Sequence, residues 1–290
     1  MQHNWQFLIF LISNANIFYI DMKLSIIVLA KQVPDTRNVG KDAMTAEGTV
    51  NRSALPAIFN PEDLNALEQA LRIKELYPES VVRILTMGPP RAAEIIQEGL
   101  FRGTDGGWLL TDRLFAGADT LATSYALATA IKKAGKVDII ISGRQAIDGD
   151  TAQVGPQVAE KLNLPQVTYA ESIEVNNDYT LTVHRHIDNG VETVEVPMPC
   201  LITVNGSAAS CRPRNAKRVM TYKHYELPES CCWSVADIDG DPAQCGLSGS
   251  PTKVKAVQNI VFQAKEVKTL SASDEDLKSL ITELKGNKVI

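Results

Sequence analysis

The chain has 290 residues, of which 44% are hydrophobic and 22% are charged, and its formal net charge is −5. This length and apolar content allow a full hydrophobic core, and we expect one medium-sized domain with an appendage. The acidic balance argues against a nucleic acid as the main ligand, because binding a polyanion over a large face requires surplus lysine and arginine. A small nucleotide is not excluded, since it needs only a local pocket.

The N-terminal stretch contains an apolar run from Phe7 to Ile12. This run is too short to span a bilayer, and it has neither a basic flank nor a cleavage site of small residues. We therefore expect no membrane insertion. Met22 leads directly into an apolar strand pattern, so we expect the protein to start there, with residues 1–21 a non-native or disordered extension.

The cysteines are odd in number and form neither a CxxC pair nor a metal-ligand spacing with histidine. They are Cys200, Cys211, Cys231, Cys232 and Cys245. This pattern predicts free thiols, no structural metal and a reducing, cytoplasmic compartment.

From Met22 onwards, strand patterns alternate with helix patterns. Strands are expected at 25–30, 81–87, 106–112 and 137–142, and helices at 60–77, 91–101, 115–135 and 151–162. Asn60 is suited to cap the first of these helices, with Pro61 at its first position. Four strand-helix units in succession predict an α/β fold with a doubly wound, mostly parallel, Rossmann-like sheet.

The second part of the chain has a different pattern. Alternating strands are expected at 166–175, 179–187, 191–196 and 200–204, which favours an antiparallel β-meander. Residues 212–249 are loop-rich, and Ser273 is suited to cap an amphipathic C-terminal helix. We expect an α/β domain at 22–222 and an extended C-terminal arm at 223–290 that must pack on another surface.

The turn after the fourth strand, GRQAIDGDTAQVG from Gly143 to Gly155, is the most informative segment. It matches neither G-x-G-x-x-G nor the P-loop pattern. A helix that starts at Thr151 would offer its positive end to an anion. Asp150 is suited either to ribose hydroxyls or to the cap of that helix. From spacing alone, a nucleotide site and an ordinary capped turn both remain open.

A second helix start rich in hydroxyl groups precedes this turn. In GADTLATS, Asp119 and Thr120 are suited to cap a helix, and Thr123 and Ser124 follow one turn later. An ordinary capped helix explains these residues equally well. Because both helix starts lie at one edge of the sheet, a shared ligand becomes a stronger hypothesis.

No catalytic constellation stands out in the sequence. His184 and His186 share one face of an expected strand without a partner in catalytic spacing, so we interpret that face as solvated. The cluster of Arg212, Arg214, Lys217 and Arg218 suits an acidic partner or a solvated surface.

Taken together, the motifs resemble the beta subunit of the electron transfer flavoproteins. The stretches that carry the resemblance are LAKQVPD, NPEDLNALEQAL, MGPPRAAEIIQEGLFRGTD, DRLFAGADTLATSYALATAI, DIIISGRQAIDGDTAQVGPQVAEKL and GLSGSPTKV. They extend from the first strand to about Val254, and Gly143 to Leu162 is the most specific of them. The resemblance implies an adenine-nucleotide-binding α/β fold.

The resemblance also implies a set of nucleotide contacts. They are Leu29, Ala30, Asn60, Asp63, Met87, Gly88, Gly143, Arg144, Gln145, Asp150, Thr151, Gln153, Val154 and Gly155. Some members of the family hold AMP, whereas electron-bifurcating members hold FAD. FAGADTLATS and GLSGSPT are similar to the bifurcating members, so FAD is expected and AMP is the alternative. Asp119, Thr120, Thr123 and Ser124 would then meet the second phosphate.

The family resemblance further implies partners. They are an alpha subunit that carries a flavin and contacts the C-terminal arm, NADH, an acyl-CoA dehydrogenase or quinone-linked oxidoreductase, and a ferredoxin or flavodoxin. One departure concerns the dehydrogenase, because Asn215 and Ala216 replace the family's tyrosine and anchoring leucine. Two alternatives remain: a redox-inactive subunit that holds AMP, and an adenine-nucleotide sensor of the universal-stress type.

Overall fold

The structure is a computed structural model that describes residues 22–35, 56–252 and 269–289. The chain divides into two compact units, Met1–Val254 and Lys255–Ile290. The expected extension at residues 1–21 lies outside the described residues.

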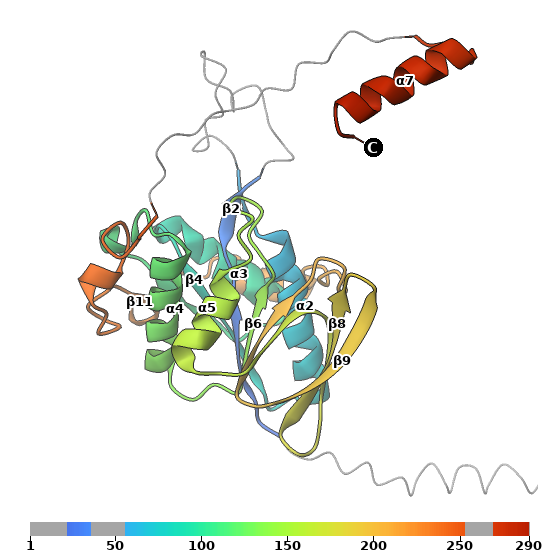
Figure 1. Cartoon of the computed structure of the whole chain (residues 1–290). Coiled ribbons are helices and arrows are strands. Elements are labelled where there is room, and N and C mark those ends of the chain that lie inside the picture. Colours follow the sequence, from blue (N-terminus) through green and yellow to red (C-terminus); the bar gives the residue numbers. More distant parts are fainter. Residues whose placement is uncertain (1–21, 36–55, 253–268, 290) are drawn as a thin grey trace, which may run out of the picture. The chain divides into compact units, whose positions relative to one another are not determined.

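The first unit contains a sheet with the strand order β11-β5-β4-β1-β6-β10-β7-β8-β9 (Figure 1). Its parallel part consists of β1 (Ser25–Leu29), β4 (Val81–Met87), β5 (Gly107–Leu110), β6 (Ile139–Gly143), β10 (Cys200–Val204), β11 (Cys232–Trp233) and β7 (Gln166–Val175). This confirms the expected doubly wound, mostly parallel α/β fold. The chain passes from β1 to β4 on one side of β1 and places β6 on the other side, so a topological switch point lies between β1 and β6.

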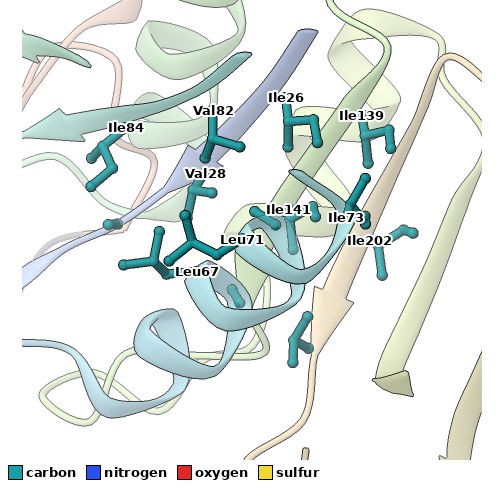
Figure 2. Packing of buried hydrophobic residues seen from close by; sticks show 14 of the residues in the cluster. Ile26, Val28, Leu67, Leu71, Ile73, Val82, Ile84, Ile139, Ile141 and Ile202 are labelled. Carbon is teal, nitrogen blue, oxygen red and sulfur yellow. The ribbon is translucent and has the colours of Figure 1, made fainter. Parts of the chain in front are cut away.

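Helices cover both faces of the sheet. On one face lie α2 (Pro61–Leu76) and α3 (Ala93–Arg102), and on the other lie α4 (Thr120–Ala134) and α5 (Val154–Leu162). Alternate residues of β1 enter the two cores, with Ile26 and Val28 on the α2 side and Ile27 on the α4 side. Figure 2 shows Leu67 and Leu71 of α2 in the same cluster as apolar side chains of β1, β4 and β6. The continuous apolar strands are explained by burial on both faces.

An antiparallel extension completes one end of the sheet, where β8 (Thr180–Ile187) pairs with β7 and β9 (Gly190–Pro197) pairs with β8. The expectation that residues 200–204 are the fourth strand of this meander is wrong, because β10 lies parallel between β6 and β7. All five residues of β10 are buried, and a strand buried on both faces belongs in the centre of a sheet rather than in an exposed meander.

The loop-rich part of the chain belongs to the first unit. It contains α6 (Ala216–Tyr222), short 3₁₀ turns at Glu229–Cys231 and Pro242–Gln244, and the edge strand β11. Trp233 stacks on Trp108 with ring centroids 5.3 Å apart, and Val235 and Ile238 are buried. The first unit therefore continues past the expected boundary at residue 222, because residues beyond it complete the core on the α4 side.

Short elements complete the secondary structure. A two-stranded sheet pairs β2 (Gln32–Pro34) with β3 (Ala57–Phe59), and 3₁₀ turns lie at Pro90–Ala92 and Arg113–Phe115. In the second unit, Ser273 caps α7 (Asp274–Gly286) as expected, by accepting a hydrogen bond from the Asp276 N–H. Among the described residues, none of the helices combines the length and apolar content needed to cross a bilayer.

Candidate functional site

The carboxyl ends of three neighbouring strands form the floor of the candidate site. Leu29 at the end of β1 pairs with Leu85 of β4 on one side and Ser142 of β6 on the other. Ala30, Gly88 and Gly143 are consequently brought to one edge of the sheet, next to the switch point. The sequence-predicted residues at these three strand ends therefore lie together.

Asn60 precedes α2, and its side chain contacts the turn after β6. The Asn60 Nδ2 group donates to the Gln145 carbonyl (2.9 Å), and Asn60 Oδ1 accepts from the Ile147 N–H (3.1 Å). Asn60 is thus the N-cap residue by position, but its side chain makes no capping hydrogen bond to the helix. The expected cap is corrected to a link between α2 and the turn.

Asp63 in the first turn of α2 joins the ends of β1 and β6. Its carboxylate accepts from the Lys31 N–H (2.8 Å) and from the Gly143 N–H (3.0 Å). Burial raises the pKa of Asp63 to about 7, although both N–H groups and Asn60 act to lower it. The Lys31 ammonium pairs with Asp148 at 2.7 Å, which adds a second link between the same two loops.

Glu62 holds the residues that directly follow β6. It accepts from Arg144 Nη2 (2.9 Å), Arg144 Nε (3.3 Å) and the Gln145 N–H (3.1 Å). The Glu62 hydrogen bond raises the pKa of Arg144, whose guanidinium also lies 5.6 Å from the Tyr169 ring centroid. Sequence reasoning did not single out Glu62. The pattern that could have identified it is an acidic residue in the first turn of α2, a helix that begins beside the strand ends.

Two glycines allow the close approach of these elements. A Cβ on Gly143 would lie 2.5 Å from Asp63 Oδ1 and 2.7 Å from the Glu62 carbonyl carbon. A Cβ on Gly155 would lie 2.7 Å from Thr203 Cγ2 and 3.0 Å from Ser142 Oγ. Gly143 therefore lets the turn contact α2, and Gly155 lets α5 pack on the sheet.

The second half of the turn has an unusual backbone. Asp150 and Ala152 have φ values of 48° and 52°, and α5 begins only at Val154, with Gln153 as its N-cap residue. The expectations that the helix starts at Thr151 and that Asp150 caps it are both wrong. Left-handed residues interrupt the helix there, and the Asp150 carboxylate instead accepts from Gln145 Nε2 at 2.8 Å.

Polar groups without partners gather at the start of α5. In the described part of the chain, no hydrogen bond is found for the backbone N–H groups of residues 151–155, and no side chain caps α5. Ser142 Oγ and Gln157 Oε1 are also buried without a partner there. Amide groups at a helix start favour an anion, so this arrangement fits a phosphate group.

The start of α4 differs, because Asp119 occupies it. Asp119 Oδ1 accepts from the N–H groups of Leu121 (3.0 Å) and Ala122 (3.1 Å). Its Oδ2 accepts from the Thr252 N–H (3.1 Å) and hydroxyl (2.7 Å), and the Asp119 N–H donates to Ser250 Oγ (2.8 Å). Burial acts to raise the pKa of Asp119, but the hydrogen bonds outweigh it and the pKa is lowered.

Hydroxyl groups next to Asp119 connect α4 with α5. Thr120 Oγ1 lies 2.9 Å from Gln153 Oε1 and 3.4 Å from Gln157 Nε2, so the two helix starts are adjacent as expected. Ser124 is fully buried and donates to the Leu121 carbonyl at 2.8 Å. The Thr120 hydroxyl therefore links the two helix starts, whereas the Ser124 hydroxyl binds only within α4.

Two other sequence features lie outside this edge. His184 and His186 lie on β8, within 4.0 Å of Glu174 and 3.3 Å of Glu171, respectively. Asn215 caps α6 by accepting from the Arg218 N–H (3.1 Å). It lines a hollow of about 670 Å³ with Ala216 and the arginines of the basic cluster.

Comparison with known proteins identifies the family. The electron transfer flavoprotein domain matches residues 47–230. The caffeyl-CoA reductase-Etf complex subunit CarD of Acetobacterium woodii is 44% identical, over 92% of this chain and all of its own length. The electron transfer flavoprotein subunit beta of Clostridium acetobutylicum is 47% identical, over 80% of this chain and 86% of its own. The acryloyl-CoA reductase electron transfer subunit gamma of Anaerotignum propionicum is 50% identical, over 80% of this chain and 86% of its own length. The chain therefore belongs to the electron transfer flavoprotein family and to the group of its beta subunits.

Proposed function

We propose that this protein is the beta subunit of a heterodimeric electron transfer flavoprotein that binds FAD at the switch-point edge of its sheet. In this role it takes electrons from NADH, in a bifurcating reaction, or from a dehydrogenase, and passes them to flavin and acceptor partners. The names of two relatives, subunits of caffeyl-CoA and acryloyl-CoA reductase systems, support a partner that acts on an acyl-CoA. A cytoplasmic location is part of the proposal.

The observation that carries this proposal is the open start of α5 beside three strand ends. The N–H groups of residues 151–155 and the buried Ser142 hydroxyl supply donors for a phosphate. Thr120 and Gln157 extend this polar edge toward α4. These groups fit an adenine nucleotide, and the longer FAD would replace Gln153 as the acceptor of the Thr120 hydroxyl.

FAD requires no acid-base residue from the protein, because the flavin supplies the redox chemistry and the protein supplies position and potential. This agrees with the absence of a catalytic constellation from the sequence. The work of this chain is then to bind the nucleotide, to orient it along the sheet edge and to exclude water from it.

Asp119 changes one part of the expected contact set. Its carboxylate already satisfies the first N–H groups of α4, and a second negative charge there would be repelled. We therefore propose that the second phosphate contacts the Thr120 side chain and the start of α5 rather than the first N–H groups of α4. Asp119 instead joins FAGADTLATS to GLSGSPT, the two segments that resemble bifurcating members.

The occupied start of α4 also favours the second candidate function, a subunit that holds only AMP and serves as a docking site for acyl-CoA dehydrogenases. One phosphate needs only the donors at α5. The universal-stress sensor is set aside, because the electron transfer flavoprotein domain covers residues 47–230.

The experiment is a cofactor count on the heterodimer co-expressed with its alpha subunit. Two flavins per heterodimer, with flavin reduction by NADH, support FAD in this subunit. Thr120→Leu should then remove one flavin while AMP still binds, and Thr129→Leu, a change in the same helix beyond its first turn, should retain both. A wild-type heterodimer with one flavin and one AMP would establish the second candidate instead.

A further inference from the structure

We propose that Glu62 is a positioning residue that fixes the nucleotide-binding turn through Arg144 and Gln145. The inference rests on the proposed nucleotide site but not on the choice between FAD and AMP. Glu62 is not among the nucleotide contacts that the family resemblance implies.

Four N–H groups in the first half of the turn form internal hydrogen bonds. The N–H groups of Gly143, Gln145 and Ile147 are taken by Asp63, Glu62 and Asn60, respectively, and the Arg144 N–H donates to the Val204 carbonyl at 2.8 Å. These groups are unavailable to a ligand. The first half of the turn therefore sets the direction in which the second half leaves the sheet.

Of Asn60, Glu62 and Asp63, Glu62 is the residue that forms both an ion pair with a side chain of the turn and a hydrogen bond with its backbone. Its side chain is only 14% exposed, and Arg144 binds both of its oxygens. Gly206 lies beside the pair, since a Cβ there would be 3.7 Å from Glu62 Oε1. A charge-assisted, two-point contact gives directional restraint as well as attraction. Loss of Glu62 would leave both Arg144 and the Gln145 N–H without their acceptor.

Glu68, two turns further along α2, provides a matched control. It accepts from Arg212 Nε (2.9 Å), Arg212 Nη2 (3.1 Å) and the Arg212 N–H (3.0 Å), and its side chain is 7% exposed. The two glutamates thus make almost the same set of bonds from the same helix. Only Glu62 contacts the turn, so a purely structural role predicts equal effects of changing either residue.

The test compares Glu62→Ala, Glu62→Gln and Glu68→Gln in the heterodimer with the alpha subunit. The probe is AMP, measured as bound nucleotide after purification and as the dissociation rate on dilution, with melting temperature recorded in parallel. Glu62→Ala should speed dissociation by about tenfold or more, since losing a charged partner is expected to cost at least that factor. Glu62→Gln keeps an acceptor for Gln145 and should be intermediate, whereas Glu68→Gln should match the wild type.

Hydrogen exchange of the Gln145 amide provides a readout that does not require a nucleotide. Protection should fall in Glu62→Ala and remain in Glu68→Gln. Equal nucleotide dissociation in wild type and Glu62→Ala, or an equal loss in Glu68→Gln, would overturn the inference. If the wild-type heterodimer retained no nucleotide while Gln145 lost protection in Glu62→Ala, the proposed binding function would fail and the positioning of the turn would stand.

Discussion

Gly143→Ala is the most direct perturbation of the contact between α2 and the turn. The new Cβ would lie 2.5 Å from Asp63 Oδ1, 2.7 Å from the Glu62 carbonyl carbon and 2.8 Å from the Asp63 backbone nitrogen. Two of these atoms belong to the backbone and cannot rotate away, so either the turn or α2 must shift. The shift would also stretch the bond from the Gly143 N–H to the buried Asp63 carboxylate.

The magnitude follows from two contributions. Overpacking in a well-packed site costs about 1 to 3 kcal/mol, and a buried acceptor that loses its donor costs about 1 to 3 kcal/mol. We expect Gly143→Ala to lower the free energy of unfolding by roughly 2 to 5 kcal/mol, because the two contributions overlap only in part. In a domain of this size, each kcal/mol corresponds to a decrease of about 2 to 4 °C in melting temperature.

The assay is thermal unfolding of the heterodimer, combined with bound nucleotide measured after gel filtration. Gly149→Ala is the matched control in the same turn, since a Cβ at Gly149 would have no atom within 4 Å and the backbone there is not left-handed. This control should stay within about 0.5 kcal/mol of the wild type. Equal melting temperatures and nucleotide contents for Gly143→Ala and Gly149→Ala would refute the packing of the turn on α2.

Three further predictions concern the ionisation of Asp63, the contact of Asp119 with Ser250 and Thr252, and the second unit. The pKa of Asp63 is raised to about 7, so the native state binds this proton more tightly than the unfolded chain does. The free energy of unfolding of the wild type, relative to that of Asp63→Asn, should therefore fall as pH rises from about 4 to 7 and level off above. A difference that stays flat in urea titrations across that range would contradict the raised pKa. Asp119→Ala removes a helix cap worth about 0.5 to 2 kcal/mol and the two bonds that hold Thr252. Limited proteolysis should therefore cut near residues 246–252 faster than in Asp241→Ala, which loses the bonds that Asp241 accepts from the Ala243 N–H and from Gln244 Nε2. Equal cutting rates would argue against this role of Asp119. Truncation after Thr252 should leave the first unit folded but weaken binding to the alpha subunit, as measured by size-exclusion chromatography. The reason is that Leu277, Leu280 and Ile281 of α7 are 37% to 47% exposed, and burying each side chain is worth about 1.5 to 3 kcal/mol. A truncated pair that still elutes as a tight heterodimer would show that the arm is not needed for assembly.

The sequence predicted those parts of the fold that depend on local pattern. Strands β1 and β6 contain continuous apolar runs, β4 is mostly apolar, and α4 has a strong cap at Asp119, so both kinds of element were located within a few residues. The strand β10 was assigned to the meander because it follows β9 closely, whereas its position depends on pairing with β6, which lies far away in the sequence. The two-residue strand β11 is too short to produce any periodic signal.

The site was predicted by residue type but not by role. Asn60 looked like a helix cap, yet its amide bonds the turn some 85 residues later. Asp150 also looked like a cap, but its left-handed backbone is coupled to a bond with Gln145 rather than to α5. In both cases the local rule identified a polar side chain at a strand or helix end. Long-range contacts decided which backbone groups it binds.

The turn from Gly143 to Gly155 therefore combines two kinds of residue, which substitutions should separate. In the first half, three N–H groups bind side chains at the start of α2, so changes at Asn60, Glu62 or Asp63 act on the position of the turn. They should alter the affinity for AMP and FAD by similar factors. The second half has donors without internal partners, so a change there acts on the phosphate contact itself. Its effect should depend on how many phosphates the ligand carries, because only groups in contact with the ligand can distinguish one ligand from another.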